Sequence, residues 1–341
     1  MKKTLSSVIK YIFFLGLGVF LIWWSLRQIP DDKWNEFIQS LTNARFWLVI
    51  PVFFILSASH LLRALRWRIL MQPMGYTPTI KNTFSAVMIG YLANLAVPRL
   101  GEVLKCTILA RYEKVPAEKL VGTIVAERAF DVISLALVFL LSFTLQYDIV
   151  GSYAKEVINE LFKTKAGSFS INKIIIAVAV VIILIVALRI WFNQFSHLKI
   201  VIAIQKILKG IWEGLNSIRN VKQKGLFIFY SITIWGLYIV GTWVGLYATH
   251  GTTGLGLKDA ISALAFASIG MILTPGGIGA YAYFMAKVLE RSDIPFTLGY
   301  ANGTLQWFAQ FAIVVIVGFA CVILLPIINK HKPNMNNNET R

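Results

Sequence analysis

Long apolar runs, two of them interrupted by proline and glycine, restrict this chain more than any other feature of its sequence. The runs lie at residues 11–26, 46–62, 83–97, 121–145, 174–192, 226–249, 260–289 and 303–328. A helix needs about 20 apolar residues to cross a bilayer core, and the six uninterrupted runs can reach that length when their polar ends are included. We therefore predict an all-α polytopic membrane protein.

The first run follows a short basic start, Met1-Lys2-Lys3, as the apolar stretch of a signal peptide does. Residues 23–28 (Trp-Trp-Ser-Leu-Arg-Gln) contain no small-residue cleavage site. We therefore expect an uncleaved helix, which is the first of the six predicted spans.

The two interrupted runs stop at residues 98–102 (Pro-Arg-Leu-Gly-Glu) and 275–279 (Pro-Gly-Gly-Ile-Gly). Proline and glycine break the hydrogen-bond ladder of a helix, and inside a membrane a break is tolerated only against protein or a water-lined cavity. We expect both segments to be re-entrant helical hairpins, so that six spans and two hairpins make about eight membrane segments. Hairpins that enter from opposite sides are typical of an inverted repeat with a binding site near the bilayer midplane.

The basic residues indicate which way the interrupted runs turn. The chain has 33 Lys and Arg against 16 Asp and Glu, a net charge of +17. If both runs turn back, the N-terminus, residues 63–81, 111–119 and 189–224, and the C-terminal tail share one side, which the positive-inside rule makes the cytoplasm. We predict a multi-pass protein of the plasma (inner) membrane with both termini cytoplasmic. Its transmembrane domain covers residues 1–330, and a short disordered tail covers residues 331–341.

Composition limits the function classes. Hydrophobic residues make up 57% of the chain, and the basic surplus is spread between apolar runs, so nucleic acid is not an expected partner. The four histidines lack metal-binding spacing, and no P-loop, Gly-x-Ser-x-Gly or Cys-x-x-Cys motif occurs, so we expect no metal or other cofactor. Cys106 and Cys321 lie in or beside apolar runs and are interpreted as packing residues.

The first candidate site is the mouth of the first predicted hairpin. A half-helix that starts at Pro98 leaves N–H groups unpaired, and these favour an anion. Arg99 adds a permanent charge whose geometry matches phosphate, and Glu102 would orient Arg99 or receive a cationic headgroup. Asn94, a polar residue inside an apolar run, and Gly101, at the break, complete the set. The alternative is an interfacial loop whose charges simply face water.

The second candidate site is Glu127-Arg128-x-x-Asp131. Glu127 and Asp131 share a helix face, and Arg128 and Asp131 are spaced to form an ion pair. Ionisable groups inside a span usually face a cavity or a partner. If the hydrocarbon instead begins at Ala129, Glu127 and Arg128 lie at the headgroup level. We keep two roles open: a structural ion pair that braces the first hairpin, and substrate contact or proton coupling.

The third candidate site is the second break. Thr274 is expected to cap a half-helix that Pro275 begins, and the glycines let a backbone or a headgroup approach closely. A glycine-rich segment is also a common device for packing helices. The candidate residues here are Thr274, Pro275, Gly276, Gly277, Gly279 and Tyr281.

Arg66 is a further candidate. It lies with Arg63 and Arg68 directly after the second run and beside Trp67, a combination typical of an interface with anionic lipid. Anchoring at that interface is one interpretation, and binding of lipid phosphate at an entry gate is the other.

Four motifs follow one another over nearly the whole chain. They are Leu65-Arg66-Trp67, Asn94 with Pro98-Arg99-Leu100-Gly101-Glu102, Glu127-Arg128-x-x-Asp131, and Pro275-Gly276-Gly277-Ile278-Gly279. In this order and at these separations, the chain resembles the lysylphosphatidylglycerol synthase transmembrane-region family of flippase-like proteins. The resemblance implies translocation of a polar or anionic lipid, either a phospholipid or a polyprenyl-linked lipid, between leaflets. The aminoacyltransferase domain of the fused members has no counterpart in this chain, so we expect transport rather than catalysis.

One position departs from the family pattern. Ala282 stands where members often have Glu, in the pattern Pro-Gly-Gly-x-Gly-x-x-Glu. A carboxylate role in the second hairpin is therefore not expected here, and the flanking Tyr281 and Tyr283 are left to supply hydrogen bonds or stacking.

Two other function classes remain as alternatives. The first is an intramembrane enzyme, or an enzyme partner, that acts on lipid-linked sugars or phosphates with Glu102, Glu127 and Asp131 as acid or base. The second is a membrane scaffold for a separate glycosyltransferase or aminoacyltransferase. Assembly into an oligomer is compatible with each of these functions.

Overall fold

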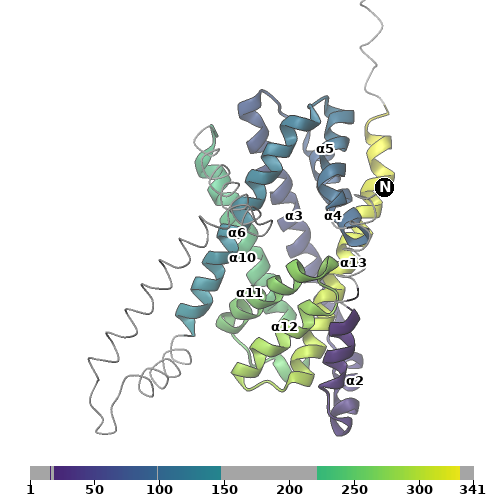
Figure 1. Ribbon diagram of the computed structural model, residues 1–341, viewed down its shortest axis with the longest axis vertical. Helices are drawn as coiled ribbons and strands as arrows, with labels where there is room; N and C mark the ends of the chain where they lie inside the picture. Colours follow the sequence, from purple (N-terminus) through teal and green to yellow (C-terminus); the bar gives the residue numbers. More distant parts are fainter. Residues whose placement is uncertain (1–15, 17–18, 98, 147–220, 331–341) are drawn as a thin grey trace, which may run out of the picture.

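The computed structural model describes residues 16, 19–97, 99–146 and 221–330, and all regular structure within them is helical (Figure 1). The all-α prediction is confirmed for this part of the chain. Outside the described residues lie the run at 174–192, the basic loop up to residue 220, the tail, and residues 11–15, 17 and 18 of the first run. The α-helices are α2 (Trp34–Thr42), α3 (Val49–Met71), α4 (Ile80–Ala96), α5 (Leu100–Glu113), α6 (Ala117–Leu145), α10 (Lys224–Leu246), α11 (Leu257–Leu273), α12 (Ala280–Leu289) and α13 (Phe296–Ile328).

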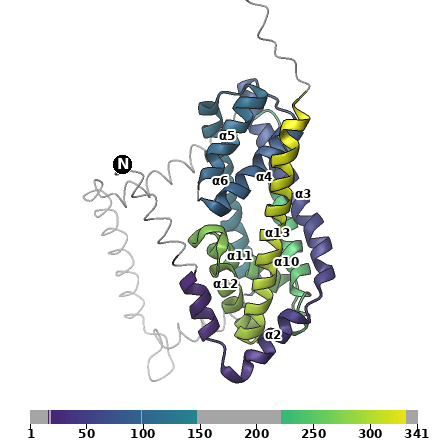
Figure 2. The same cartoon turned by 90° about the vertical axis from the view of Figure 1, so that its right-hand side faces the viewer.

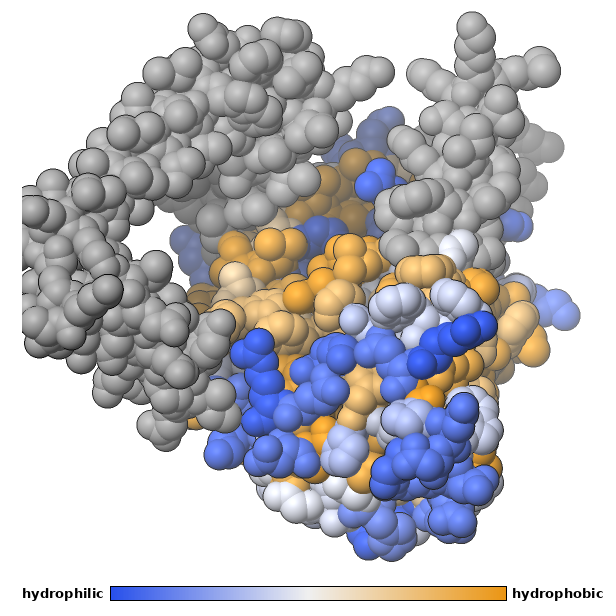
Figure 3. All heavy atoms as spheres, turned by 60° about the horizontal axis from the view of Figure 1, so that its bottom comes forward, coloured by the Kyte–Doolittle hydropathy of each residue, from blue (hydrophilic) through white to orange (hydrophobic). Residues whose placement is uncertain are grey.

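Within the described ranges, three segments are long and apolar enough to cross a membrane, namely Phe46–Met74, Lys224–Leu246 and Phe296–Ile328. Large apolar side chains on all three face outward; Phe54, Ile232 and Ile323 are 65%, 68% and 65% exposed. Hydrophilic residues gather at one end of the molecule, whereas hydrophobic residues cover the body next to it (Figure 3). Soluble monomers rarely expose apolar surface on this scale, so these helices are suited to lipid. The count of six spans stays a prediction.

α3 and α10 form an antiparallel pair in the bundle. Arg45, before α3, donates its backbone N–H to the carbonyl oxygen of Ala248, after α10, at 2.8 Å. Further along, Nη1 of Arg66 in α3 donates to Oγ of Ser231 in α10 at 3.3 Å. Residue numbers rise along one helix as they fall along the other, so the two helices run in opposite directions.

A tight helical hairpin follows each helix of this pair, α4–α5 after α3 and α11–α12 after α10 (Figures 1 and 2). In the first hairpin, a Cβ atom on Gly101 would collide with the carbonyl oxygen of Gly90. In the second, a Cβ atom on Gly270 would lie 2.6 Å from the carbonyl carbon of Ala280 and from the backbone nitrogen of Tyr281. Glycine therefore allows the backbones to touch in both hairpins. Because α3 and α10 are antiparallel, the hairpins enter the bundle from opposite ends.

The tips of the two hairpins meet inside the bundle. A Cβ atom on Gly276, in the second tip, would lie 3.1 Å from Cδ2 of Leu95, near the first tip. Trp307 of α13 donates its indole N–H to the carbonyl oxygen of Gly276 at 2.7 Å. The two hairpins also make equivalent contacts with the other helices. α4 packs on α13 as α11 packs on α6, and α3 packs on α4 as α10 packs on α11.

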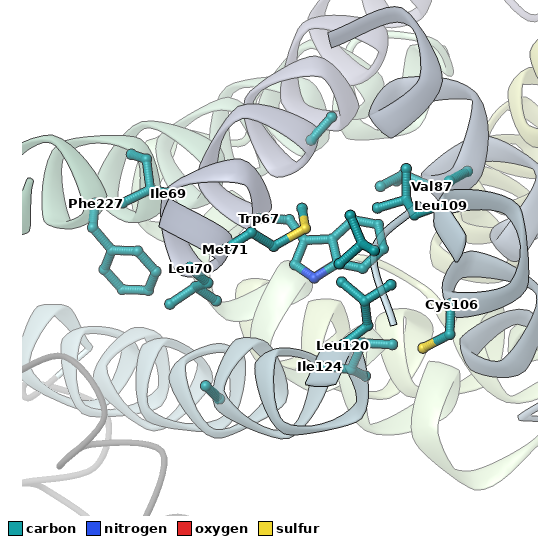
Figure 4. Packing of buried hydrophobic residues seen from close by; sticks show 14 of the residues in the cluster. Trp67, Ile69, Leu70, Met71, Val87, Cys106, Leu109, Leu120, Ile124 and Phe227 are labelled. Carbon is teal, nitrogen blue, oxygen red and sulfur yellow. The ribbon is translucent and has the colours of Figure 1, made fainter. Parts of the chain in front are cut away.

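The starts of α4 and α6 and the ends of α5 and α13 lie together at one end of the bundle. Asn82 and Asn329 exchange hydrogen bonds of 3.0 and 2.8 Å, and Asn82 also donates to Glu113 at 2.5 Å. Beneath this end lies the largest apolar cluster, in which the side chain of Trp67 is fully buried and is surrounded by residues of α3, α4, α5 and α6 (Figure 4). The basic segments at residues 63–81 and 111–119 therefore lie towards this same end of the bundle.

Candidate functional site

Five ionisable side chains from three helices form a buried network. None of these side chains is more than 13% exposed. Three cations face two carboxylates, so one positive charge is in excess when all are ionised. The members are Arg63 and Arg66 of α3, Lys105 of α5, and Glu127 and Asp131 of α6. We refer to this set as the ionic network.

Both carboxylates of the ionic network contact more than one cation. Oδ2 of Asp131 lies 2.9 Å from Nη1 of Arg63, and Oδ1 lies 2.7 Å from Nη2 of Arg66. Oε2 of Glu127 lies 2.9 Å from Nζ of Lys105, and Oε1 lies 3.4 Å from Nη1 of Arg63. Each carboxylate oxygen has a cationic donor, which is the condition for keeping such charges away from water.

Aromatic and hydroxyl side chains hold the cations in place. Nε of Arg63 donates to the hydroxyl of Tyr238 at 2.7 Å. Nζ of Lys105 lies 4.5 Å from the ring centroid of Trp67, within the range of a cation–π interaction. The indole N–H of Trp67 in turn donates to Oγ1 of Thr123 at 2.8 Å. These contacts fix the network to α6 on one side and to α10 on the other.

Helical spacing explains why these side chains meet. Arg63 and Arg66 are three residues apart on α3, and Glu127 and Asp131 are four apart on α6, so each pair lies on one helix face. The two faces have opposite charge and oppose each other across the α3–α6 contact. The predicted shared face of Glu127 and Asp131 is therefore present in the structure.

Lys105 was not among the predicted site residues. Its stem passes over Gly90, where a Cβ atom would lie 2.7 Å from Cγ of Lys105. The signal was a lone lysine within an otherwise uncharged stretch, Val103–Ala110, at a position that only the fold of the first hairpin brings to Glu127.

The expectation that Arg66 lies at a lipid interface is wrong, because its side chain is fully buried. α3 continues to Met71, so the arginines lie within the helix, opposite α6, and not beyond the end of a span. Glu127 is fully buried as well, and the alternative that puts it at the headgroup level stays a prediction. Arg68 donates Nε to the carbonyl oxygen of Pro78 at 2.7 Å.

The tip of the first hairpin presents an exposed cation. Arg99 is exposed and has a left-handed backbone, with φ 69°, directly before α5. The N–H of Gly101 donates to Oδ1 of Asn94 at 2.8 Å, so Asn94 caps one of the helix-start N–H groups that we expected to be unpaired. Pro98 lies outside the described residues.

Glu102 and Arg128 form a looser pair between α5 and α6. Nη2 of Arg128 lies 3.8 Å from Oε1 of Glu102, and the side chains are 42% and 30% exposed. Oε2 of Glu102 and Nε of Arg128 are buried atoms for which the described residues supply no hydrogen-bond partner. Arg128 therefore pairs with Glu102 and not, as expected, with Asp131, because Asp131 contacts the arginines of α3.

The second tip corrects two predictions. Thr274 does not cap a helix, since its hydroxyl donates to the carbonyl oxygens of Ile278 at 3.0 Å and Gly270 at 3.3 Å. Pro275 begins only a 3-10 turn, η6 (Pro275–Gly277), and the half-helix α12 begins at Ala280. The cause is the glycine backbone that intervenes, with φ of 61°, 74° and 70° at Gly276, Gly277 and Gly279.

Tyr281 and Ala282 pack inside the second half of the bundle. The hydroxyl of Tyr281 accepts a hydrogen bond from Nε2 of Gln310 at 2.9 Å, and its side chain is buried. Ala282 lies against α13, where a Cβ atom on Gly303 would be 2.8 Å from Cα of Ala282. Residue 282 is therefore a close-packing position in this chain.

The described residues contain no group of three or more His, Cys, Asp or Glu side chains arranged to hold a metal. Cys106 and Cys321 are free thiols in buried positions, as their interpretation as packing residues requires.

The chain is similar in sequence to known membrane proteins. The family described as "Lysylphosphatidylglycerol synthase TM region" matches residues 8–327. The chain belongs to this family. A curated relative, the UPF0104 membrane protein MJ1595 of Methanocaldococcus jannaschii, is 22% identical over 334 residues, which is 95% of each chain. No solved structure matches the chain significantly. The ionic network is thus a feature of a membrane protein of the lysylphosphatidylglycerol synthase TM-region family.

Proposed function

We propose that this member of the lysylphosphatidylglycerol synthase TM-region family is a flippase-like protein that binds the headgroup of a polar or anionic lipid and moves it between leaflets. The main support is the ionic network, because ionisable groups among apolar helices are costly and usually mark a substrate path. A headgroup phosphate that leaves water meets the same cost, and fixed cationic donors lower it. The excess positive charge of the network favours an anion.

The proposed path passes the meeting point of the hairpin tips. From Glu102 to Glu113, at the end of α5, the helix rises about 16 Å. With that end at the membrane surface, Glu102 and Arg99 come close to the middle of a hydrocarbon core about 30 Å thick. The hairpins α4–α5 and α11–α12 then enter from opposite leaflets as re-entrant parts of an inverted repeat. The basic end of the bundle is the cytoplasmic one in this arrangement.

For two of the three carboxylates of the enzymatic alternative, Glu127 and Asp131, a role as general base receives less support from the same geometry. A general base needs a carboxylate oxygen that is free to accept a proton. In Glu127 and Asp131, each oxygen lies within 3.4 Å of a cationic nitrogen. These contacts suit a different role better, in which the two carboxylates partly neutralise the surrounding cations.

Arg99→Ala is expected to slow lipid scrambling by about tenfold, the effect of losing one charge-assisted hydrogen bond. The measurement is the scrambling rate of an acyl-labelled anionic phospholipid in proteoliposomes that contain the purified protein. Arg291→Ala removes another exposed arginine, in the turn between α12 and α13, and serves as the matched control. An unchanged rate in Arg99→Ala would remove Arg99 from the path.

Single cysteines at Lys114, Lys222 and Lys258 test the membrane arrangement, in a protein whose Cys106 and Cys321 are replaced by alanine. All three lysines are exposed. We expect an impermeant maleimide to reach positions 114 and 222 from one side of sealed vesicles and position 258 from the other. Labelling of 114 and 222 from opposite sides would refute the re-entrant first hairpin.

A further inference from the structure

The short helix before α3 covers the start of α13. α2 packs against α13 at one end of the bundle (Figures 1 and 2). Phe37 of α2 shares an apolar cluster with Phe296 and Tyr300 of α13 and with residues of α12. The ring centroids of Phe37 and Tyr300 lie 6.0 Å apart. In this setting, Phe296 and Tyr300 are only 9% and 4% exposed.

α6 and α13 occupy equivalent places in the bundle, because each follows a helical hairpin and packs on the second helix of that hairpin. Glu102 and Ala282 are the third residues of these second helices, α5 and α12. Glu102 pairs with Arg128 of α6, whereas Ala282 lies against Gly303 of α13. Position 303 of α13 therefore corresponds to position 128 of α6.

In this register, two covered residues of α13 correspond to two open residues of α6. Phe296 and Tyr300 lie seven and three residues before Gly303, as Val121 and Val125 lie before position 128. Val121 and Val125 are 55% and 43% exposed. Within the described ranges, no helix covers these valines as α2 covers α13. The start of α6 is thus an apolar face without the partner that its equivalent has.

The equivalent of α2 is the segment that precedes α10, because α2 precedes α3 and the helices α3 and α10 correspond. Residues 204–218 of this segment lie outside the described residues, but their sequence has apolar residues at the i, i+3, i+4, i+7, i+11 and i+14 positions that one face of a helix requires. Polar residues and glycine occupy most positions between them. The apolar stripe is Ile204, Ile207, Leu208, Ile211, Leu215 and Ile218.

The stripe also lies at the right distance along the chain. Phe37 and Leu41, the residues through which α2 packs on α13 and α12, lie 12 and 8 residues before the start of α3. Ile211 and Leu215 lie 13 and 9 residues before the start of α10. The two segments therefore carry apolar pairs at positions that agree to within one residue.

The described chain resumes beside the open face of α6. Val221 is buried in the apolar cluster around Trp67, together with Leu120 and Ile124 of α6. Ile218, at the end of the stripe, is three residues before Val221, so the two Cα atoms are separated by at most about 11 Å. The stripe consequently ends within reach of the first turns of α6.

We propose that residues 204–218 form an amphipathic helix whose apolar stripe packs on the start of α6, over Val121 and Val125, as α2 packs on the start of α13. An apolar face of this kind is a surface that a helix buries against its neighbour. The occupant of the face is thus a segment of the same chain, in place of lipid or a second copy.

Cysteine pairs test this contact in a protein whose Cys106 and Cys321 are replaced by alanine. Val125→Cys combined with Ile211→Cys reproduces the place of the contact between Phe37 and Tyr300. After treatment with a short bismaleimide, we expect mass spectrometry of the digested protein to show an intramolecular cross-link. Its yield should be several-fold higher than that of Val125→Cys with Glu213→Cys, because position 213 lies on the opposite side of a helix from position 211.

A second control moves the other cysteine. Leu140→Cys combined with Ile211→Cys should give no cross-link, because Leu140 is equally apolar and exposed but lies about 22 Å further along α6 than Val125. Equal yields for positions 211 and 213 overturn the proposal. A cross-linked dimer on a denaturing gel also overturns it, since a second copy then occupies the face.

A nitroxide label distinguishes the segment from lipid. Val121 is the fifth residue of α6, and Ile228, which is also exposed, is the fifth residue of α10. Both helices start at the same end of the bundle, because Leu120 and Phe227 share one apolar cluster. In proteoliposomes, the label on Val121→Cys is expected to collide with oxygen several-fold less often than the label on Ile228→Cys, as measured by power saturation in electron paramagnetic resonance.

Removing the stripe should abolish that difference. Ile211→Asn together with Leu215→Asn is expected to raise the collision rate at position 121 to the rate at position 228, and to leave position 228 unchanged. Equal rates at the two positions without these substitutions would show that lipid covers the start of α6, and would overturn the proposal. Neither measurement depends on lipid transport, so this contact and the proposed function are tested separately.

Discussion

Glu127→Gln is expected to reduce the stability of the purified protein by about 3–5 kcal/mol, the effect of removing one partner from a buried charge cluster. Glu127 is fully buried and lies 2.9 Å from Lys105, 3.4 Å from Arg63 and 3.9 Å from Arg66. Without its charge, three cations face the single carboxylate of Asp131. The measurement is thermal unfolding in detergent, followed by intrinsic tryptophan fluorescence.

A second substitution tests the cause of that loss. Lys105→Met alone should also destabilise the protein, because it leaves the Oε2 atom of Glu127 without its ammonium donor. In the double variant the excess charge returns to its original value, so most of the loss should be recovered. Glu290→Gln, in an exposed pair with Lys287, is the control and should change stability by less than about 1 kcal/mol. Losses that simply add in the double variant would contradict a coupled Glu127–Lys105 pair.

Stability alone does not account for the ionic network. Replacing a buried ion pair by apolar residues of similar volume is often neutral or stabilising. A network with three cations and two carboxylates is also unbalanced, which a purely structural cluster does not require. Excess positive charge inside the bundle agrees with the anionic headgroup that we propose as the substrate.

The helix breaks could be predicted from the sequence because their causes are local. Proline and glycine act on their own backbone and on the adjacent turn, so the interruptions at residues 98–102 and 275–279 indicated where the chain folds back. The detail of the second break was less accessible. Three glycines with positive φ, Gly276, Gly277 and Gly279, delay the start of α12. The rule that proline begins a helix does not include that effect.

The partners of the charged residues could not be predicted, because they depend on tertiary contacts. The spacing of Glu127 and Asp131 indicated a common face but not what it opposes. Arg63 and Arg66 follow an apolar run and resemble interfacial anchors, yet α3 continues and turns them towards α6. Lys105 reaches the ionic network only because the first hairpin folds α5 back beside α6.

The first half of the bundle, α3–α6, and the second half, α10–α13, differ in the polar residues that they bury. On α13, Asn302 and Gln306 repeat the four-residue spacing that Glu127 and Asp131 have on α6. Nε2 of Gln306 donates to Oδ1 of Asn302 at 2.8 Å, and Nδ2 of Asn302 donates to the carbonyl oxygen of Gly245 at 3.0 Å. These amides are neutral and are satisfied by their neighbours. Under the proposed inverted repeat, α6 therefore provides charge for a headgroup, whereas the equivalent positions of α13 provide neutral amides.

Gly101→Ala and Gly270→Ala are expected to destabilise the two hairpins to a similar degree, by about 1–3 kcal/mol or more each. A methyl group on Gly101 would collide with the carbonyl oxygen of Gly90, and one on Gly270 would lie 2.6 Å from the backbone of Ala280. Backbone atoms cannot rotate aside as a flexible side chain does, so each hairpin has to open. Thermal unfolding in detergent reports the loss for each variant.

Gly122→Ala is the matched control, because it makes the same change in the interior of α6 with no atom within 4 Å of the added methyl group. Alanine in a helix interior is favoured over glycine by roughly 0.5–1 kcal/mol, so this variant should be slightly more stable than the wild type. A loss at Gly122 as large as that at Gly101 would mean that the methyl group acts through the helix itself. Tolerance of alanine at both Gly101 and Gly270 would contradict the close backbone contact that allows the two tips to meet.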